Sequence, residues 1–185
     1  MQINRRNLSW ARFAVALLLL APTGCTKPFA PSPFFQSQLL GDVRQFLSAK
    51  GTVGSSAERT YVDPKHPDFH YRDVVVHVAM PQDKAQAMFA ELNDLVLREA
   101  AAGGTTITNP NSNMASSMSD VDSSEFVYTT ASQGLGRLSI RLVQGKAELT
   151  ETIGPKGEKL SGMTISTTSG DQFVVIVHLE ESKKS

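Results

Sequence analysis

Arg72-Asp73-Val74-Val75-Val76-His77-Val78-Ala79-Met80 is the stretch around which the sequence predicts the fold to form. Every even-numbered position from Val74 to Met80 is apolar, and so are Val75 and Ala79 on the opposite side, where His77 is the exception. Because successive side chains of a strand point to opposite faces, this pattern indicates a strand buried on both faces. A histidine in such a strand is usually a hydrogen-bonded core residue, and its alternative role is in the wall of a binding site.

A long helix is predicted directly after this strand, from Pro81 to Ala102. Proline suits the first helical position, and Gly103-Gly104 supplies a left-handed stop. Apolar residues recur along the segment at helical spacing and give it one apolar face. That face consists of Ala85, Met88, Phe89, Leu92, Val96 and Ala100.

Before the central strand, the sequence predicts a short amphipathic helix over residues 39–47 and then mostly turns, with one short strand at 59–62. His66 and His70 lie among aspartates in this turn-rich segment and are candidate metal ligands. Pro67 opposes the helix that would bring both histidines to one side. A solvated loop is therefore the expected state, and no metal or cofactor is predicted.

After the long helix, residues 109–124 are mostly polar and are predicted to form a mobile loop. Strands are predicted at 125–131, 137–142, 147–153, 160–168 and 172–180. A hairpin turn at Gly145 is expected, which would place Ala147 and Leu149 on the same face as Leu138.

Together these elements predict an α+β domain in which an antiparallel β-meander wraps on the helix at 81–102, with the short N-terminal helix beside it. The order of strand, helix and meander resembles cystatin-like folds. That resemblance is one of topology alone and transfers no activity.

The last predicted strand is apolar on both faces. Val174 and Ile176 share one face with His178, and His77 belongs to the corresponding face of the central strand. Something must cover this second face, and the candidates are the helix at 39–47, a bound ligand or a partner protein. These four residues are the candidate partner or ligand face.

The N-terminus carries Arg5, Arg6 and Arg12 ahead of the apolar run Phe13 to Ala21, with no acidic residue in the first 24 positions. This is the pattern of an export signal, because the apolar run is too short to span a membrane. The arginine pair at positions 5 and 6 leaves both the general and the twin-arginine export routes open.

Thr23-Gly24-Cys25 resembles the end of the lipobox of bacterial lipoproteins, although Pro22 stands where that family usually has leucine. The resemblance implies that residues 1–24 are removed and that Cys25 carries the lipid. Thr26 at the next position implies transport to the outer membrane, facing the periplasm. The lone cysteine agrees with this interpretation, because it cannot form an internal disulfide.

Residues 25–36 are proline-rich and are predicted to be a tether, followed by a single domain over residues 37–185. Removing residues 1–24 takes away three of the 18 basic residues and none of the 18 acidic ones, which leaves a formal charge of −3. A chain without concentrated positive charge is a poor candidate for binding nucleic acid.

The sequence shows no convergent set of nucleophile, base and metal ligands, so an enzyme is not predicted. The favoured function is a membrane-anchored module that docks another envelope protein or assists its assembly. The alternative is a lipid-anchored carrier with a small apolar ligand between sheet and helix, and with His77 or His178 at the wall of its pocket.

Overall fold

The computed structural model describes residues 29–111, 120–132 and 134–183. Within these ranges the chain forms two helices, α1 (Leu39–Ser48) and α2 (Gln82–Ala102), and a seven-stranded antiparallel sheet. The strands are β1 (Thr52–Asp63), β2 (His66–Ala79), β3 (Thr106–Asn111), β4 (Asp120–Thr129), β5 (Leu135–Ile153), β6 (Lys159–Thr167) and β7 (Gln172–Ser182).

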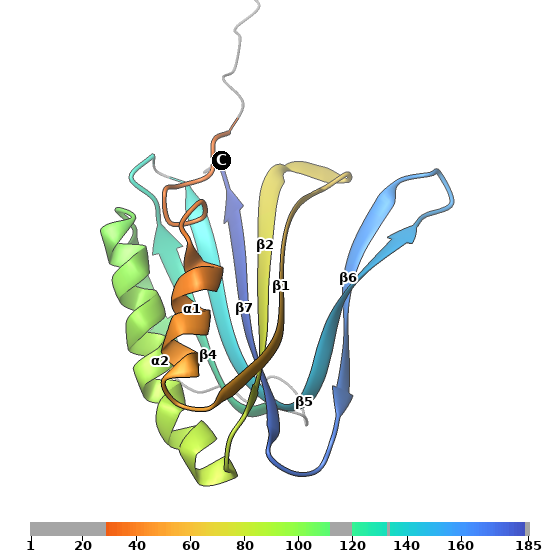
Figure 1. The fold of residues 1–185 in the computed structure, drawn as a ribbon. Helices are drawn as coiled ribbons and strands as arrows, with labels where there is room; N and C mark the ends of the chain where they lie inside the picture. Colours follow the sequence, from red (N-terminus) through yellow and green to blue (C-terminus); the bar gives the residue numbers. More distant parts are fainter. Residues whose placement is uncertain (1–28, 112–119, 133, 184–185) are drawn as a thin grey trace, which may run out of the picture.

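The strands do not follow one another across the sheet. Their order is β1-β2-β7-β5-β4-β3, so the C-terminal strand β7 lies between β2 and β5, and β6 pairs with the second half of β5. The sheet curls into a half-barrel, with both helices along one side of it and the β5–β6 hairpin projecting on the other (Figure 1).

One face of the sheet, called here the inner face, packs against both helices. The even-numbered side chains of β2 and the apolar stripe of α2 share this core with α1, and most of its members are fully buried. Burying a valine or leucine completely stabilises the fold by about 1.5–3 kcal/mol relative to leaving it exposed. The main core of the domain is therefore the contact between the helices and this face.

The opposite face, called here the outer face, has a second and smaller core. Val75, Val174 and Ile176 are buried there under the β5–β6 hairpin, together with Val143 and Ala147. The hairpin can reach this face because β5 bends at Gly145, where φ is +150° and a Cβ atom would lie 2.1 Å from the Ser166 carbonyl oxygen. Only glycine fits this bend.

The predicted meander wrapped on one long helix is wrong. Both predicted helices form, but the sheet does not enclose α2, and its strands are not in meander order. The expected turn at Gly145 is a bend within one 19-residue strand, so the alternation of faces continues through it. Ala147 and Leu149 accordingly pack on the outer face, opposite to Leu138.

Two segments predicted as loops are strands. Most of the turn-rich region at 51–71 forms the β1–β2 hairpin, whose polar side chains alternate with few apolar ones and so give a weak strand signal. Part of the predicted mobile loop belongs to β3 and to β4, which begins at Asp120, and residues 112–119 lie outside the described ranges. Pairing with β5 overrides the polar composition there.

The segment before α1 is packed on the domain from Phe29 onwards. Phe34 and Phe35 belong to the main core, and the Arg72 guanidinium donates to the carbonyl oxygens of Phe35 and Ser37, each at 2.6 Å. Most of the predicted tether is thus part of the domain. Among the described residues, no helix has the length and apolar character needed to cross a membrane.

Candidate functional site

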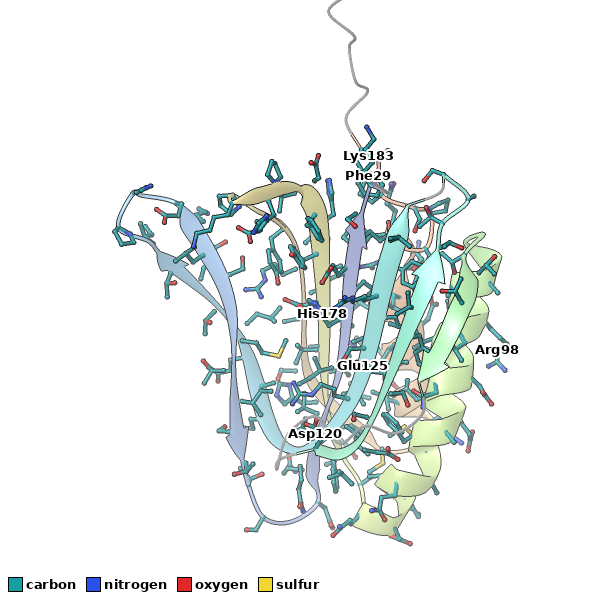
Figure 2. The ribbon with its side chains drawn as sticks, turned by 180° about the vertical axis from the view of Figure 1, so that it is seen from behind. Phe29, Arg98, Asp120, Glu125, His178 and Lys183 are labelled. Atoms are coloured by element: carbon teal, nitrogen blue, oxygen red, sulfur yellow. The ribbon has the colours of Figure 1, made fainter. Side chains whose placement is uncertain are left out.

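A polar row crosses the outer face of the sheet above its second core. The strand registers pair Arg59 with Asp73, Asp73 with His178, His178 with Ser139, and Ser139 with Glu125. Directly opposite residues of antiparallel strands point to the same face. Five polar side chains from five neighbouring strands therefore lie in one line, near whose middle His178 is seen in Figure 2.

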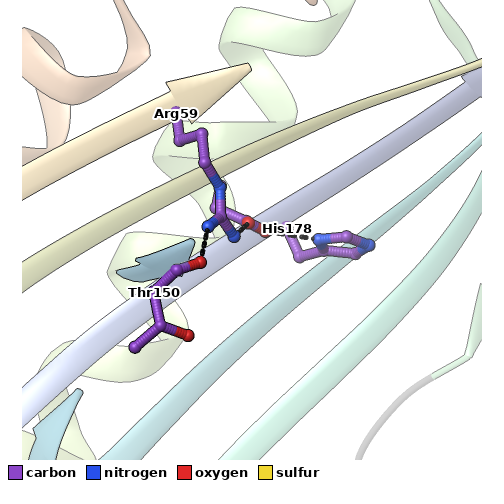
Figure 3. Close-up of polar contacts among 4 residues, drawn as sticks. Arg59, Thr150 and His178 are labelled. Atoms are coloured by element: carbon purple, nitrogen blue, oxygen red, sulfur yellow. Dashed lines mark hydrogen bonds and ion pairs between the residues drawn. The ribbon is translucent and has the colours of Figure 1, made fainter. Parts of the chain in front are cut away.

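Asp73 is the second residue of this row and contacts both of its neighbours in it. Its carboxylate accepts a hydrogen bond from Arg59 Nη2 at 2.6 Å through one oxygen, and from His178 Nδ1 at 2.6 Å through the other. The Asp73 side chain is only 4% exposed, whereas that of His178 is 35% exposed. Figure 3 shows Arg59 on one side of this carboxylate and the His178 ring on the other.

The pKa of Asp73 lies below its ordinary value. Burial alone would raise this pKa, but the hydrogen bonds from His178 and Arg59, together with the charges of these two side chains, outweigh it. The ionised carboxylate therefore stays in the sheet because both its oxygens have charged or polar donors.

Aromatic rings extend the site towards the β1–β2 turn. Tyr61 and Tyr71 stack with centroids 5.0 Å apart, Tyr71 stacks on His178 at 6.0 Å, and the Arg59 guanidinium lies 4.8 Å from the centroid of Tyr61. Burial, with the charge of Asp73 next, raises the pKa of Tyr61 to about 12. Rigid tyrosines beside an arginine are the composition typical of protein-binding surfaces.

The β5–β6 hairpin is joined to β1 and β2 by side chains. Arg59 Nη1 donates to the Thr150 carbonyl oxygen at 2.7 Å (Figure 3), and His77 Nε2 accepts the Ala147 N–H at 3.2 Å. Because that ring nitrogen is an acceptor, Nδ1 carries a proton and donates to the Ser55 carbonyl oxygen at 3.1 Å. His77 is thus a hydrogen-bonded link between three strands.

These side-chain bonds join β1 and β2 to the second half of β5, although β1 and β5 are not paired by main-chain hydrogen bonds in the described residues. β1 is the edge strand of the main sheet, and among the described strands it pairs with β2 alone. The second half of β5 is paired with β6 on one side only, from Gly145 to Ile153. Beyond the Arg59–Thr150 bond, the β1–β2 turn and the β5–β6 turn line one common hollow. Two strand edges that no ladder joins therefore border the same gap.

The four candidate residues on the second face are indeed brought together on the outer face. Val174 and Ile176, however, are 0% and 2% exposed, because the β5–β6 hairpin of the same chain covers them. That cover is none of the three that the sequence suggested. His77 and His178 lie at the border of this core, in the polar network.

The substitution Ile176→Val tests whether the β5–β6 hairpin covers this part of the outer face. Removing one buried methylene should lower the free energy of unfolding by about 1 kcal/mol, since Ile176 packs in the outer core. Urea unfolding followed by circular dichroism measures this change. Ile153→Val, at a side chain that is 77% exposed, is the matched control and should have almost no effect. Equal effects of the two substitutions would contradict the described packing.

A second feature is an open groove of about 800 Å³ between the segment before α1 and the edge of the sheet. Its apolar lining includes Phe35, Leu40 and Val62, and the ion pair of Arg72 with Glu58, at 2.6 Å, lies along it. The groove is on the inner side of β1, so this face of the strand is open to contact.

Of the remaining sequence candidates, His66 and His70 take part in aromatic contacts, and His70 also lines this groove. His66 packs edge-on against Phe69, and His70 lies against Phe29 and Phe35. No group of three or more potential ligands close enough to hold a metal is found in the described part of the chain. Cys25, the predicted lipid attachment site, lies outside the described residues.

Sequence reasoning missed Arg59, Asp73 and the two stacked tyrosines. One signal was available, because Asp73 has the same parity as Val75 and His77 in a strand predicted to be buried on both faces. A buried carboxylate requires a partner. The partner could not be named, since β1 was not recognised as a long strand.

Comparisons with protein-family models, with curated proteins and with solved structures find no match for this chain.

Proposed function

We propose that this chain is a lipid-anchored envelope protein without enzymatic activity, which docks an extended segment of another envelope protein along the free edge of β1. Cys25 holds the lipid, and the outer membrane, on its periplasmic side, is the proposed location. The observation that carries the docking mode is a pair of strand edges, on β1 and the second half of β5. In the described part of the chain no ladder pairs these strands, and the side chains of Arg59 and His77 link them.

The chemistry of β1 supports an extended partner. Strand addition supplies main-chain hydrogen bonds along a free edge, and pockets for alternate side chains provide specificity. β1 is 12 residues long, and proteins usually shorten or cover such edges because they promote association. Beside this edge lie the Tyr61–Tyr71 stack and Arg59, residue types that contribute strongly to binding.

Site-specific photo-cross-linking in producing cells tests the proposal. A benzophenone amino acid replaces Ala57, which is exposed on β1, or Gln86, which is exposed on α2 and serves as the matched control. We expect a discrete protein adduct from position 57 and none from position 86. Mass spectrometry then identifies the cross-linked segment, and the corresponding synthetic peptide should slow amide exchange in β1 without changing exchange in α2.

An adduct from both positions, or a peptide that leaves the β1 amides unprotected, would contradict docking at this edge. Intact mass of the membrane fraction, compared with a Cys25→Ser chain, shows separately whether the lipid is present. The docking mode and the anchor can therefore fail independently.

The carrier remains the second candidate because of the groove beside α1, whose apolar lining and volume of about 800 Å³ suit a small apolar ligand. The same experiment separates the two functions when the benzophenone replaces Leu40, which lines this groove. An adduct of small-molecule mass at position 40, with none at position 57, would favour carriage over docking.

A further inference from the structure

Exposed apolar side chains gather at one end of the domain. Among the described residues, the large apolar side chains with high exposure are Val62, Leu135, Ile153 and Leu160, at 42%, 42%, 77% and 37%. Val62 precedes the β1–β2 turn, Leu135 opens β5, and Ile153 and Leu160 flank the β5–β6 turn. β5 changes direction at its bend, so the start of this strand and the β5–β6 turn lie at the same end of the half-barrel. The β1–β2 turn lies at that end too (Figure 1).

The N-terminal segment enters the domain at that same end. Phe29, the first described residue, and Lys183, the last, lie together there (Figure 2). Phe29 is fixed against His70 with ring centroids 5.4 Å apart, and the Ser32 N–H donates to the buried carboxylate of Glu181 at 2.8 Å. The entry point is therefore a defined place on the surface.

The distance from this place to the lipid is short. Four Cα–Cα steps separate Cys25 from Phe29, and at about 3.6 Å each they span at most about 14 Å. If Cys25 carries the lipid, as proposed above, the end with the exposed apolar residues must lie against the membrane surface. A domain held this closely cannot turn its opposite end towards the bilayer.

We infer that the β1–β2 turn, the β5–β6 turn and the start of β5 form a membrane-facing surface, which rests on the phospholipid leaflet that holds the lipid anchor. Ile153 and Leu160 enter the headgroup region, and Lys65, Lys156 and Lys183 keep their ammonium groups at headgroup level. This inference rests on the proposed anchoring at Cys25.

Charge is not the main attraction in this contact. Asp63 and Glu158 flank the same turns as Lys65 and Lys156, and these four side chains border a common hollow with Leu160. With acids and bases balanced, salt should have little influence on the contact. In this orientation the β1 edge, which ends at Asp63, rises away from the membrane and remains open to a partner.

Depth-dependent quenching tests this orientation with the whole chain. Ile153→Cys, and Ser169→Cys in the exposed turn between β6 and β7 as its control, are produced in cells, purified from membranes and labelled with a thiol-reactive fluorophore. Each is reconstituted into phosphatidylethanolamine and phosphatidylglycerol vesicles that contain a headgroup-nitroxide lipid. We expect quenching several-fold stronger at position 153 than at position 169, and little change in 1 M salt.

Equal quenching at the two positions, in a chain that is attached to the vesicles, would overturn the orientation while leaving the anchor intact. Labelling stoichiometry reports the anchor itself, because a lipidated Cys25 has no free thiol. One fluorophore per chain shows that Cys25 is blocked, whereas two per chain together with loss from the vesicles would show that the anchoring proposal has failed.

Discussion

Replacing Glu181 with alanine should lower the free energy of unfolding by about 3–4 kcal/mol. The carboxylate is fully buried and accepts three hydrogen bonds: Ser32 N–H at 2.8 Å, Ser32 hydroxyl at 2.5 Å and Tyr128 hydroxyl at 2.9 Å. Alanine would leave these donors unpaired inside the protein, and each buried unpaired donor costs about 1–3 kcal/mol. Urea unfolding at neutral pH measures the change.

Tyr128→Phe is the matched control for this prediction. It removes one donor and keeps the ring, so it should cost only about 1 kcal/mol. Burial and the neighbouring charge of Glu181 raise the pKa of the Tyr128 hydroxyl, which therefore remains a donor at all ordinary pH values.

A second readout shows whether Glu181 fixes the N-terminal segment. In the alanine variant, limited proteolysis should cut between residues 29 and 37 sooner than elsewhere, because Ser32 has lost its partner. An unfolding midpoint equal to that of the unchanged chain, with the same proteolysis pattern, would show that this carboxylate does not hold the segment.

The sequence was most informative where apolar spacing is regular. The helical stripes from Leu39 to Leu47 and from Ala85 to Ala100 lie buried as predicted, and the two-sided apolar pattern of Val74 to Met80 is that of a strand buried on both faces. The spacing of the apolar residues is enough to predict such elements. One face of an amphipathic helix contacts a core, whereas both faces of a central strand can do so.

The sheet topology could not be obtained in the same way. No local pattern says that β7 pairs between β2 and β5, since its pairing with β2 depends on contacts more than 90 residues apart. Gly145 was read as a turn because glycine marks both turns and bends. A turn at Gly145 would place Ala147 and Leu149 on the inner face. For this reason the sequence did not predict that the β5–β6 hairpin covers Ile176.

Part of the candidate site could be predicted from the sequence, for a related reason. The histidines and apolar residues of the second face could be grouped by parity, and the structure does bring them together. Arg59 belongs to a strand whose exposed and polar side chains resemble a loop. Its role arises only from the register that places it opposite Asp73.

Asp73→Asn should lower the free energy of unfolding by about 2–3 kcal/mol at pH 7. The substitution keeps the shape of the side chain but removes the charge that both Arg59 and His178 contact. An amide can accept from only one of these donors, so the other loses its partner. Arg59 also holds the Thr150 carbonyl, and amide exchange in the β5–β6 hairpin should therefore accelerate in the variant.

Glu151→Gln is the control, because Glu151 forms an exposed ion pair with Lys159 at 3.2 Å. Exposed pairs contribute little, and this change should stay within about 0.5 kcal/mol. If both substitutions had equally small effects, the buried network around Asp73 would not stabilise the sheet.

The pH dependence gives the same prediction a second test. Because the pKa of Asp73 is lower in the folded protein than in the unfolded chain, its ionised form stabilises the fold above the unfolded pKa of about 3.9. This contribution is lost as the pH falls through the lowered, folded-state pKa. The difference in unfolding free energy between the unchanged chain and Asp73→Asn should therefore shrink as the pH falls below about pH 4. A difference that stayed constant into strong acid would mean that the substitution acts through shape alone, and that the charge between Arg59 and His178 contributes nothing to holding the hairpin against β1.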